Sequence, residues 1–191
     1  MELLYLDGSP FARITRVLAR EWGVPVTETE LPFPLPERHF DIAPLGQVPV
    51  LVEDGTALFP TAIIIDRLAD HAGHTIRDPQ ALATTLAWGD ALVAAFYQTW
   101  AGLGPATRNT LGFDPATRNL SRTDPFLDWI APRLSESKPD AAEFALACIL
   151  DWTDSRHPIP WQGRPPVDAL MAQLAAHPSL TETTPRPWDF G

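Results

Sequence analysis

Short apolar runs alternate with helical periodicities over about the first 70 residues of the chain. Residues 2–6 form an apolar run of strand length, and apolar positions at helical spacing follow a turn that ends in Pro10. A Glu-Asp-Gly-Thr turn at 53–56 joins two further apolar runs and therefore predicts a β-hairpin. The predicted order is strand 2–6, helix from Pro10 to Trp22, strand 26–31, an irregular proline-rich connection, hairpin 48–59 and helix 61–69.

The second half of the chain contains helical patterns and no convincing strand pattern. Asp78, which precedes a proline, is typical of an N-cap and starts a long predicted helix that runs to about Leu103. Asp140 and Glu143 have the spacing of a capping box, and the helix after them is apolar nearly all round. We therefore expect this helix, which carries Cys148, to lie buried at the centre of a helical bundle.

The element order in the first half, β-α-β followed by β-β-α, is typical of a thioredoxin-like domain. Its first two strands would pair in parallel through a right-handed crossover, and the hairpin would add antiparallel strands. The sequence thus predicts an α/β plus all-α fold class. A thioredoxin-like βαβ-ββα domain covers residues 1–72, a linker covers 73–78, and an all-helical bundle domain covers 79–191.

Composition and charge narrow the range of partners. The 191 residues carry a formal net charge of −10 without a basic stripe that could neutralise phosphates, so we expect no nucleic acid and no membrane as partner. No signal peptide and no apolar run of membrane-spanning length are visible, which favours a cytoplasmic location. The one cysteine, Cys148, excludes an intramolecular disulfide, and no cluster of His, Cys and carboxylates has the spacing of metal ligands.

Pro49 lies near the start of the first strand of the predicted hairpin. Proline has no N–H to donate to a sheet ladder, so it is confined to strand starts, edges and bulges. The residue itself leaves two interpretations open. It is either an edge-strand proline with an ordinary trans peptide bond or part of a specific turn with a cis bond.

Five segments carry a family resemblance, and they keep the family's order over nearly the whole chain. The most specific is 44–51, Pro-Leu-Gly-Gln-Val-Pro-Val-Leu, and another is 9–13, Ser-Pro-Phe-Ala-Arg, at the start of the first helix. The others are the helix at 63–68, the capped helix at 140–152 and the His-Pro-Ser-Leu turn at 177–180. Together these segments resemble the soluble glutathione transferase family, in its bacterial, serine-type form.

The resemblance implies a cis bond before Pro49, with the backbone N–H and C=O of Val48 paired to the cysteinyl unit of glutathione. It also implies that Ser9 is the catalytic residue, whose hydroxyl donates to the glutathione sulfur and favours the thiolate. The residues alone indicate an N-cap at Ser9, a role that would compete for the same hydroxyl. The glutathione-binding residues that the resemblance implies are Phe11, Arg38, Gln47, Val48, Pro49, Pro60 and Thr61.

Pro60 departs from the family pattern, in which an acidic residue stands at this position. Thr61 retains a hydroxyl and an N–H that would hold the γ-glutamyl carboxylate at the helix N-terminus. Pro60 offers no acidic group to the ligand's amino group, and it is also typical of a plain helix start. The glycyl carboxylate would need a cation or donor, for which Arg38, His39 and Gln47 are the candidates.

An aromatic stripe on the first long helix of the second half is the candidate lining of a co-substrate pocket. Phe96, Tyr97 and Trp100 share this stripe, which by itself is typical of a core-facing helix. The resemblance places Tyr97 and Trp100 in a co-substrate pocket between the two domains. Arg13, one turn into the first helix, is expected to pair with an acidic residue across the same interface.

The resemblance therefore implies a transferase that activates glutathione, as a co-substrate and without a metal, for conjugation to a small electrophile in detoxification. Glutathione-dependent reduction or isomerisation is equally compatible, and a homodimer is implied. The alternative, favoured by Pro60, is a non-catalytic glutathione transferase-like binding or scaffold protein with a degraded glutathione site. A thiol–disulfide oxidoreductase is disfavoured because Ser9 and Ala12 stand where its two cysteines would lie.

Overall fold

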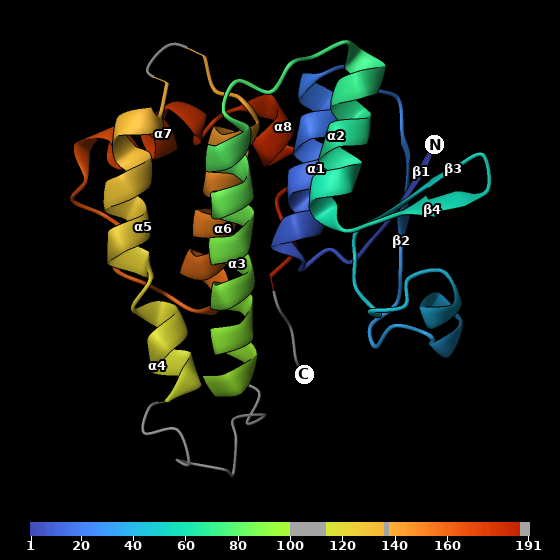
Figure 1. Cartoon of the computed structure of the whole chain (residues 1–191), viewed down its shortest axis with the longest axis horizontal. Helices are drawn as coiled ribbons and strands as arrows, with labels where there is room; N and C mark the ends of the chain where they lie inside the picture. The colour runs from blue at the N-terminus through green and yellow to red at the C-terminus, as the bar shows by residue number, and fades with distance from the viewer. Residues whose placement is uncertain (100–113, 136–137, 188–191) are drawn as a thin grey trace. The chain divides into compact units, whose positions relative to one another are not determined.

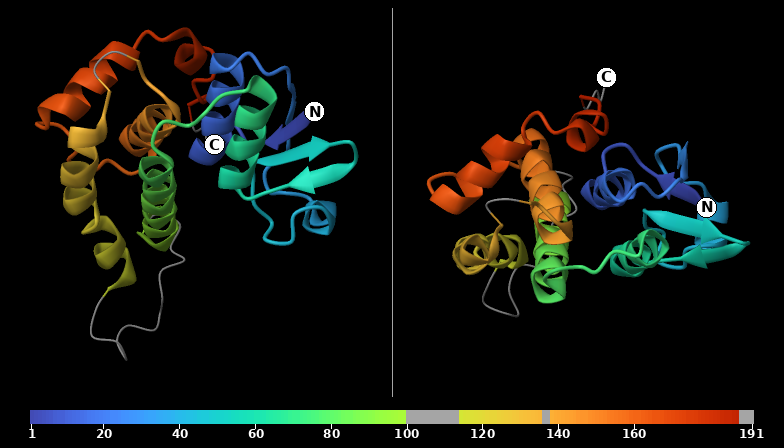
Figure 2. Two further views of the ribbon diagram at one scale, coloured as in Figure 1. Left: turned by 45° about the horizontal axis from the view of Figure 1, so that its top comes forward. Right: turned by 90° about the horizontal axis from the view of Figure 1, so that it is seen from above.

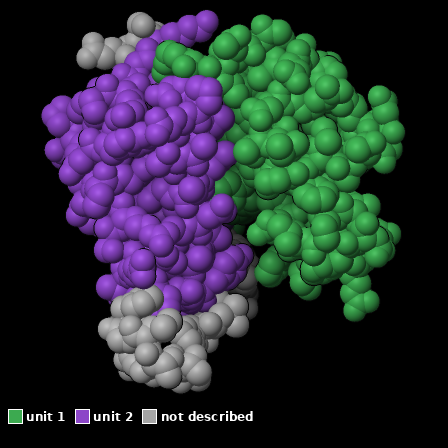
Figure 3. Space-filling model, viewed as in Figure 1, with its two compact units in different colours: residues 1–77, 174–191 green, residues 78–173 purple. Residues whose placement is uncertain are grey.

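The computed structural model describes residues 1–99, 114–135 and 138–187 of the chain. The chain divides into two compact units, one of residues 1–77 with 174–191 and one of residues 78–173 (Figure 3). The boundary after Arg77 falls within 73–78, the predicted linker. Within the described ranges, no helix combines the length and the apolar character needed to cross a lipid bilayer.

A four-stranded mixed sheet forms the centre of the first unit (Figure 1). Its strands are β1 Glu2–Tyr5, β2 Thr27–Glu30, β3 Val50–Glu53 and β4 Thr56–Leu58, in the spatial order β2-β1-β3-β4. β1 pairs in parallel with β2 and antiparallel with β3, and β3 pairs antiparallel with β4. The predicted thioredoxin-like arrangement of a β-α-β unit and a hairpin is confirmed.

The first strand of the hairpin begins two residues later than the sequence pattern predicted. β3 starts at Val50, which lies opposite Leu4 of β1. Pro49 has no N–H with which to extend the ladder, so the paired segment begins after it. Val48 is thereby left outside the sheet.

The two helices of the first unit, α1 Pro10–Glu21 and α2 Thr61–Ala72, lie side by side on one face of the sheet (Figures 1 and 2). Successive residues of a strand point to opposite faces, and β1 shows this clearly. Leu3 packs in a buried cluster with residues of α1 and α2, whereas Leu4 packs with Ala43 and Val50. The connection between β2 and β3, which contains the short helix η1 Glu37–Asp41, therefore packs against the opposite face through Ala43.

The C-terminal segment from Leu174 groups with the first unit, whereas the sequence predicts an all-helical domain that includes it. Its helix α8, Pro178–Thr181, packs against α1. The buried Arg13 guanidinium donates to the Leu180 carbonyl oxygen at 3.1 Å and to the Thr183 hydroxyl at 3.5 Å. Carbonyls at a helix end lack intrahelical partners, which makes them good acceptors for a guanidinium. The partners of Arg13 thus include a backbone carbonyl of its own unit, where only an acidic residue was expected.

The second unit is helical over its described residues. Its elements are α3 Pro79–Thr99, α4 Pro115–Leu120, α5 Thr123–Ile130, η2 Ala131–Arg133, α6 Ala141–Arg156 and α7 Pro165–Leu174. The Ala81 N–H donates to the Asp78 carboxylate at 2.9 Å, which confirms Asp78 as the N-cap of α3.

Helix α6 is the buried helix that the sequence predicted. The predicted capping box is present, and in it the Glu143 carboxylate accepts from the Asp140 N–H at 3.1 Å. All residues from 141 to 150 are buried, Cys148 among them. The two-unit body of a mixed α/β part and a helical part therefore matches the predicted fold class.

Candidate functional site

Three segments that carry predicted site residues leave the sheet at the same end. Because β1 and β3 are antiparallel with Leu4 opposite Val50, the turn after β1 lies at the same end as the residues just before β3. β4 returns to this end as well, since Leu58 pairs with Leu51. The topology therefore brings Ser9, the Val48-Pro49 pair and the Pro60-Thr61 pair to one end of the sheet.

Ser9 is the N-cap of α1, in an extended conformation with φ −85° and ψ 120°. Its Oγ accepts a hydrogen bond from the Ala12 N–H at 3.2 Å, so the N-cap interpretation is confirmed. A hydroxyl has two acceptor lone pairs and one proton, so this bond leaves the O–H available to donate to a ligand. The capping role and the donor role are therefore compatible, contrary to the expectation that they compete for one hydroxyl.

The peptide bond between Val48 and Pro49 is cis, as the resemblance implied. Pro49 is buried and Val48 is half-buried, and the sheet ladder begins only at Val50. Over the described residues, neither the N–H nor the C=O of Val48 takes part in a backbone hydrogen bond of a turn or loop. Both groups thus lie beyond the ladder at the end of the sheet that also carries Ser9.

Pro60 precedes the first helical residue of α2 and provides no side-chain cap. Its carbonyl accepts from the Ile63 N–H at 2.9 Å, so the helix starts normally despite the missing cap. Thr61, half-buried, is the first residue of α2, and the N-terminal end of a helix is a favourable place for an anion. The segment therefore retains a helix N-terminus but lacks a carboxylate at residue 60.

The three candidates for binding the glycyl carboxylate of glutathione differ in how exposed their side chains are. Arg38 and Gln47 have exposed side chains, whereas His39 is 2% exposed and its Nε2 lies 2.9 Å from the Gln47 carbonyl oxygen. This interior hydrogen bond removes His39 from the candidates for direct ligand contact. Phe11, in the first turn of α1, is half-buried.

Asp7, two residues before Ser9, anchors the C-terminal segment and was not singled out from the sequence. Its Oδ2 accepts from the backbone N–H of Arg186 at 2.7 Å and from the Arg186 Nε at 3.3 Å. Arg16 lies 3.9 Å from the other carboxylate oxygen. A carboxylate near Ser9 would disfavour a thiolate there, and the two guanidinium groups offset its charge. The partners are up to 179 residues apart, so no local pattern could have indicated the pair.

The aromatic stripe of α3 divides into a core residue and a surface residue. Phe96 is 1% exposed and packs edge-to-face on Trp152, with ring centroids 5.4 Å apart. Tyr97 is 42% exposed, and Trp100 lies outside the described residues. Phe96 is thus part of the helical core, and Tyr97 remains a candidate for ligand contact.

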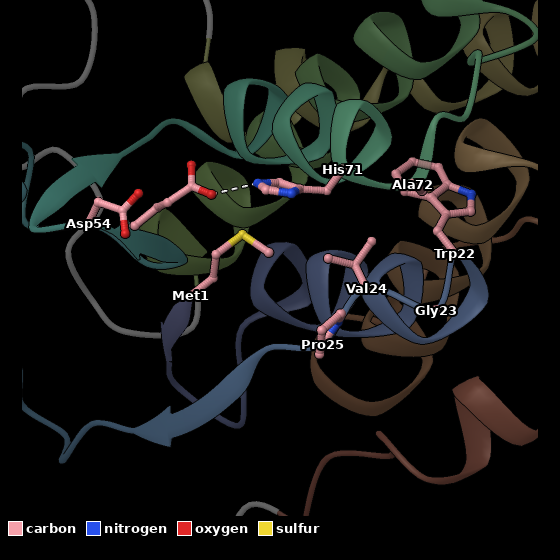
Figure 4. A pocket seen from close by; sticks show the side chains of 9 residues that line it. Met1, Trp22, Gly23, Val24, Pro25, Asp54, His71 and Ala72 are labelled. Carbon is pink, nitrogen blue, oxygen red and sulfur yellow. Dashed lines mark hydrogen bonds and ion pairs between the residues drawn. The ribbon is translucent and has the colours of Figure 1, made fainter.

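A cavity of about 560 Å³ lies at the other end of the sheet (Figure 4). Its lining includes Met1, Trp22, Val24 and Asp54, together with His71, whose Nε2 is 2.5 Å from a Glu53 carboxylate oxygen. The β3–β4 turn and the start of β1 form this end. The cavity is therefore separate from the segments that carry Ser9 and Val48.

Residues 8–71 match the family model of the glutathione S-transferase N-terminal domain. This range contains Ser9, the Val48-Pro49 pair and Thr61. The topology brings their hydroxyl and backbone groups to one end of the sheet. No curated protein sequence matches the chain.

Solved structures of bacterial glutathione transferases resemble the whole chain. One from Methylobacillus flagellatus KT, with glutathione bound, has a TM-score of 0.78 and 24% identity, over 97% of this chain and 99% of that one. One from Methylobacterium radiotolerans, in complex with glutathione sulfonate, has a TM-score of 0.79 and 20% identity, over 100% and 97%. A family member from Pseudomonas fluorescens Pf-5, with bound glutathione, has a TM-score of 0.75 and 24% identity, over 97% and 98%. The chain therefore has the fold of these proteins.

Proposed function

We propose, because residues 8–71 match the family model of the glutathione S-transferase N-terminal domain, that the protein binds glutathione and activates its thiol. The activated thiolate would be transferred to a small electrophile. Related structures with the same fold were solved with glutathione or glutathione sulfonate bound, which supports this ligand.

One observation carries the proposal: the Ser9 hydroxyl, the backbone groups of Val48 and the N-terminus of α2 occur at one end of the sheet. The Val48 N–H and C=O would pair with the cysteinyl unit of glutathione as a short added strand. Thr61 and the N-terminus of α2 would hold the γ-glutamyl carboxylate. The exposed Arg38 and Gln47 are the proposed partners of the glycyl carboxylate, and Phe11 and Pro49 would border the ligand.

Ser9 is the proposed catalytic residue. A thiol with a pKa of about 8.5 is mostly protonated at neutral pH, and only its thiolate attacks. The Ser9 O–H would donate to the sulfur while Oγ continues to accept from Ala12, and the positive end of α1 would add to the stabilisation. The thiol proton passes to solvent, the sulfur forms a bond to the electrophilic carbon, and the leaving group departs with the bonding electron pair.

Pro60 is expected to weaken glutathione binding without abolishing it. The missing charge-assisted contact to the ligand's amino group would cost about 1.5–3 kcal/mol, or roughly ten- to a hundred-fold in affinity. The non-catalytic alternative rests on this same residue and predicts binding without turnover, or no binding at all.

The proposal extends to co-substrate, assembly and location. Tyr97 and Trp100 are the proposed lining of the electrophile pocket. A homodimer is supported by large apolar side chains exposed on the connection before β3, with Phe40 53% and Leu45 69% exposed. We place the protein in the cytoplasm, where thiols are kept reduced.

Calorimetric titration with glutathione, followed by a conjugation assay with 1-chloro-2,4-dinitrobenzene, tests the proposal. We expect a dissociation constant for glutathione in the millimolar range or below, together with a conjugation rate above the uncatalysed rate. Binding without any conjugation of several electrophiles would favour the non-catalytic alternative. The absence of binding at millimolar glutathione would reject the proposed function.

A further inference from the structure

His39 is the buried polar side chain at the centre of the connection between β2 and β3. Its backbone N–H donates to the Pro36 carbonyl at 2.8 Å, and its carbonyl accepts from the Ala43 N–H at 2.9 Å. Ala43 in turn is 2% exposed and packs on Leu4 in the sheet. The backbone at residue 39 is therefore held by hydrogen bonds within the connection, and the connection packs on the sheet through Ala43.

The imidazole of His39 bonds to the residue just before Val48. Its Nε2 lies 2.9 Å from the carbonyl oxygen of Gln47. A carbonyl oxygen only accepts hydrogen bonds, so this contact requires a proton on Nε2. The imidazole is almost fully buried, whereas the side chain of Gln47 is exposed.

This bond determines the direction of the Val48 N–H. The peptide unit between Gln47 and Val48 is trans, so its C=O and N–H point in opposite directions within one plane. With the Gln47 carbonyl directed at His39, the Val48 N–H points away from the imidazole. Rotation of this peptide unit would break the hydrogen bond between His39 and the Gln47 carbonyl.

Gly46, which precedes Gln47, has a backbone conformation that favours glycine. Gly46 has φ +58°, and a Cβ atom built on it would lie 2.3 Å from the Phe40 ring. Gly46 also donates its N–H to the Ala43 carbonyl at 2.8 Å. A side chain at residue 46 would therefore be strained and would clash with Phe40, so the loop requires glycine there.

We propose that His39 is a positioning residue for glutathione, which acts through the Gln47 carbonyl to hold the Val48 N–H in the direction that a ligand carbonyl needs. The inference rests on the proposed function, because it assigns the Val48 N–H to the cysteinyl carbonyl of glutathione. His39 itself does not touch the ligand. Because His39 holds the Val48 N–H in the binding direction before glutathione arrives, less entropy is lost when the ligand binds.

A matched pair of variants isolates the donor atom. His39→Gln places an amide N–H near the position of Nε2, whereas His39→Met has similar length and no donor. We expect His39→Met to raise the dissociation constant and the KM for glutathione about threefold to tenfold, the effect of one lost hydrogen bond. His39→Gln should recover most of this loss. The kcat at saturating glutathione should stay within about twofold of wild type, because Ser9 is unchanged.

Two measurements on the ligand-free protein keep the test independent of catalysis, and the first, made on wild type, is also independent of variant folding. Nitrogen-15 NMR of the wild-type imidazole should show the Nε2–H tautomer; an Nδ1–H tautomer would overturn the inference. Residual dipolar couplings should show a reoriented Val48 N–H in His39→Met and a native one in His39→Gln.

The outcomes separate the two proposals. If wild type binds glutathione and His39→Met binds it equally well, the positioning role is rejected and the proposed function stands. If wild type does not bind glutathione, the proposed function is rejected, and the positioning role toward glutathione falls with it. Loss of kcat with an unchanged KM in His39→Met would also reject the positioning role.

Discussion

The Oγ atom of Ser9 lies 3.2 Å from the backbone nitrogen of Ala12, so the proposed activator of the thiol also holds the first turn of α1. The same hydroxyl can accept from the helix and donate to a sulfur atom. Its contributions to stability and to chemistry are therefore expected to respond differently to substitution.

Substitution of Ser9 by Ala and by Gly should separate these two contributions. Ser9→Ala removes the cap and should lower the free energy of unfolding by about 1 kcal/mol, whereas Gly at an N-cap costs only a few tenths. Both variants lack the O–H and should therefore raise the pKa of the thiol of bound glutathione. The pH profile of conjugation should then shift to higher pH. Urea unfolding and the pH dependence of kcat/KM are the measurements. Wild-type conjugation by Ser9→Gly would show that Ser9 is only a cap.

Replacement of Pro60 by Glu should tighten glutathione binding. The carboxylate would pair with the ligand's amino group, and we expect an affinity gain of roughly ten- to a hundred-fold. Pro60→Gln is the matched control, because it has the same length without the charge. Calorimetric titration of both variants is the measurement. Equal affinities for Glu and Gln would show that residue 60 does not reach the amino group.

The elements that the sequence predicted well are those whose signals are local. The capping box of α6 depends on residues three apart, and the hairpin depends on one turn between two apolar runs. Pro49 by itself leaves cis and trans open; the resemblance of the 44–51 segment implies the cis bond, and the structure contains it. Short-range patterns and a specific motif were therefore enough for the fold class.

The features that the sequence did not reveal depend on contacts between distant segments. Arg13 bonds to a carbonyl 167 residues later in the chain, which returns the C-terminal segment to the first unit. The sequence offers His39 as a candidate for ligand contact, but the fold of the irregular connection buries its side chain beside the Gln47 carbonyl. Neither contact has a periodic or spaced signal, because each depends on where an irregular segment folds back.

The capping box of α6 is expected to contribute measurably to the stability of the second unit. Asp140 is 8% exposed, and its side chain accepts from the backbone N–H of Glu143. Asp140→Ala should lower the free energy of unfolding by about 1–2 kcal/mol, while Asp140→Asn, which keeps the acceptor, should cost much less. Chemical denaturation followed by tryptophan fluorescence is the measurement. Equal losses for Ala and Asn would assign the effect to the charge instead of the cap.

Glu28 should make the stability of the first unit depend on pH in the acid range. Burial raises the pKa of Glu28, but hydrogen bonds from Arg20 and Arg16 and their positive charges outweigh it, so the folded-state pKa is lowered. Its Oε2 accepts from the Arg16 Nε at 2.8 Å, and Arg20 contacts its Oε1.

The sign of this pH effect follows from the direction of the shift. A carboxylate whose folded-state pKa lies below its unfolded value of about 4.3 stabilises the protein above that pH, and the contribution is lost as the pH falls through the folded-state pKa. The stability difference between wild type and Glu28→Gln should therefore be constant from about pH 5 to 7 and shrink in more acidic solution. Urea unfolding of both proteins across this range measures it. A difference that is independent of pH would show that the two guanidinium groups do not depend on the Glu28 charge.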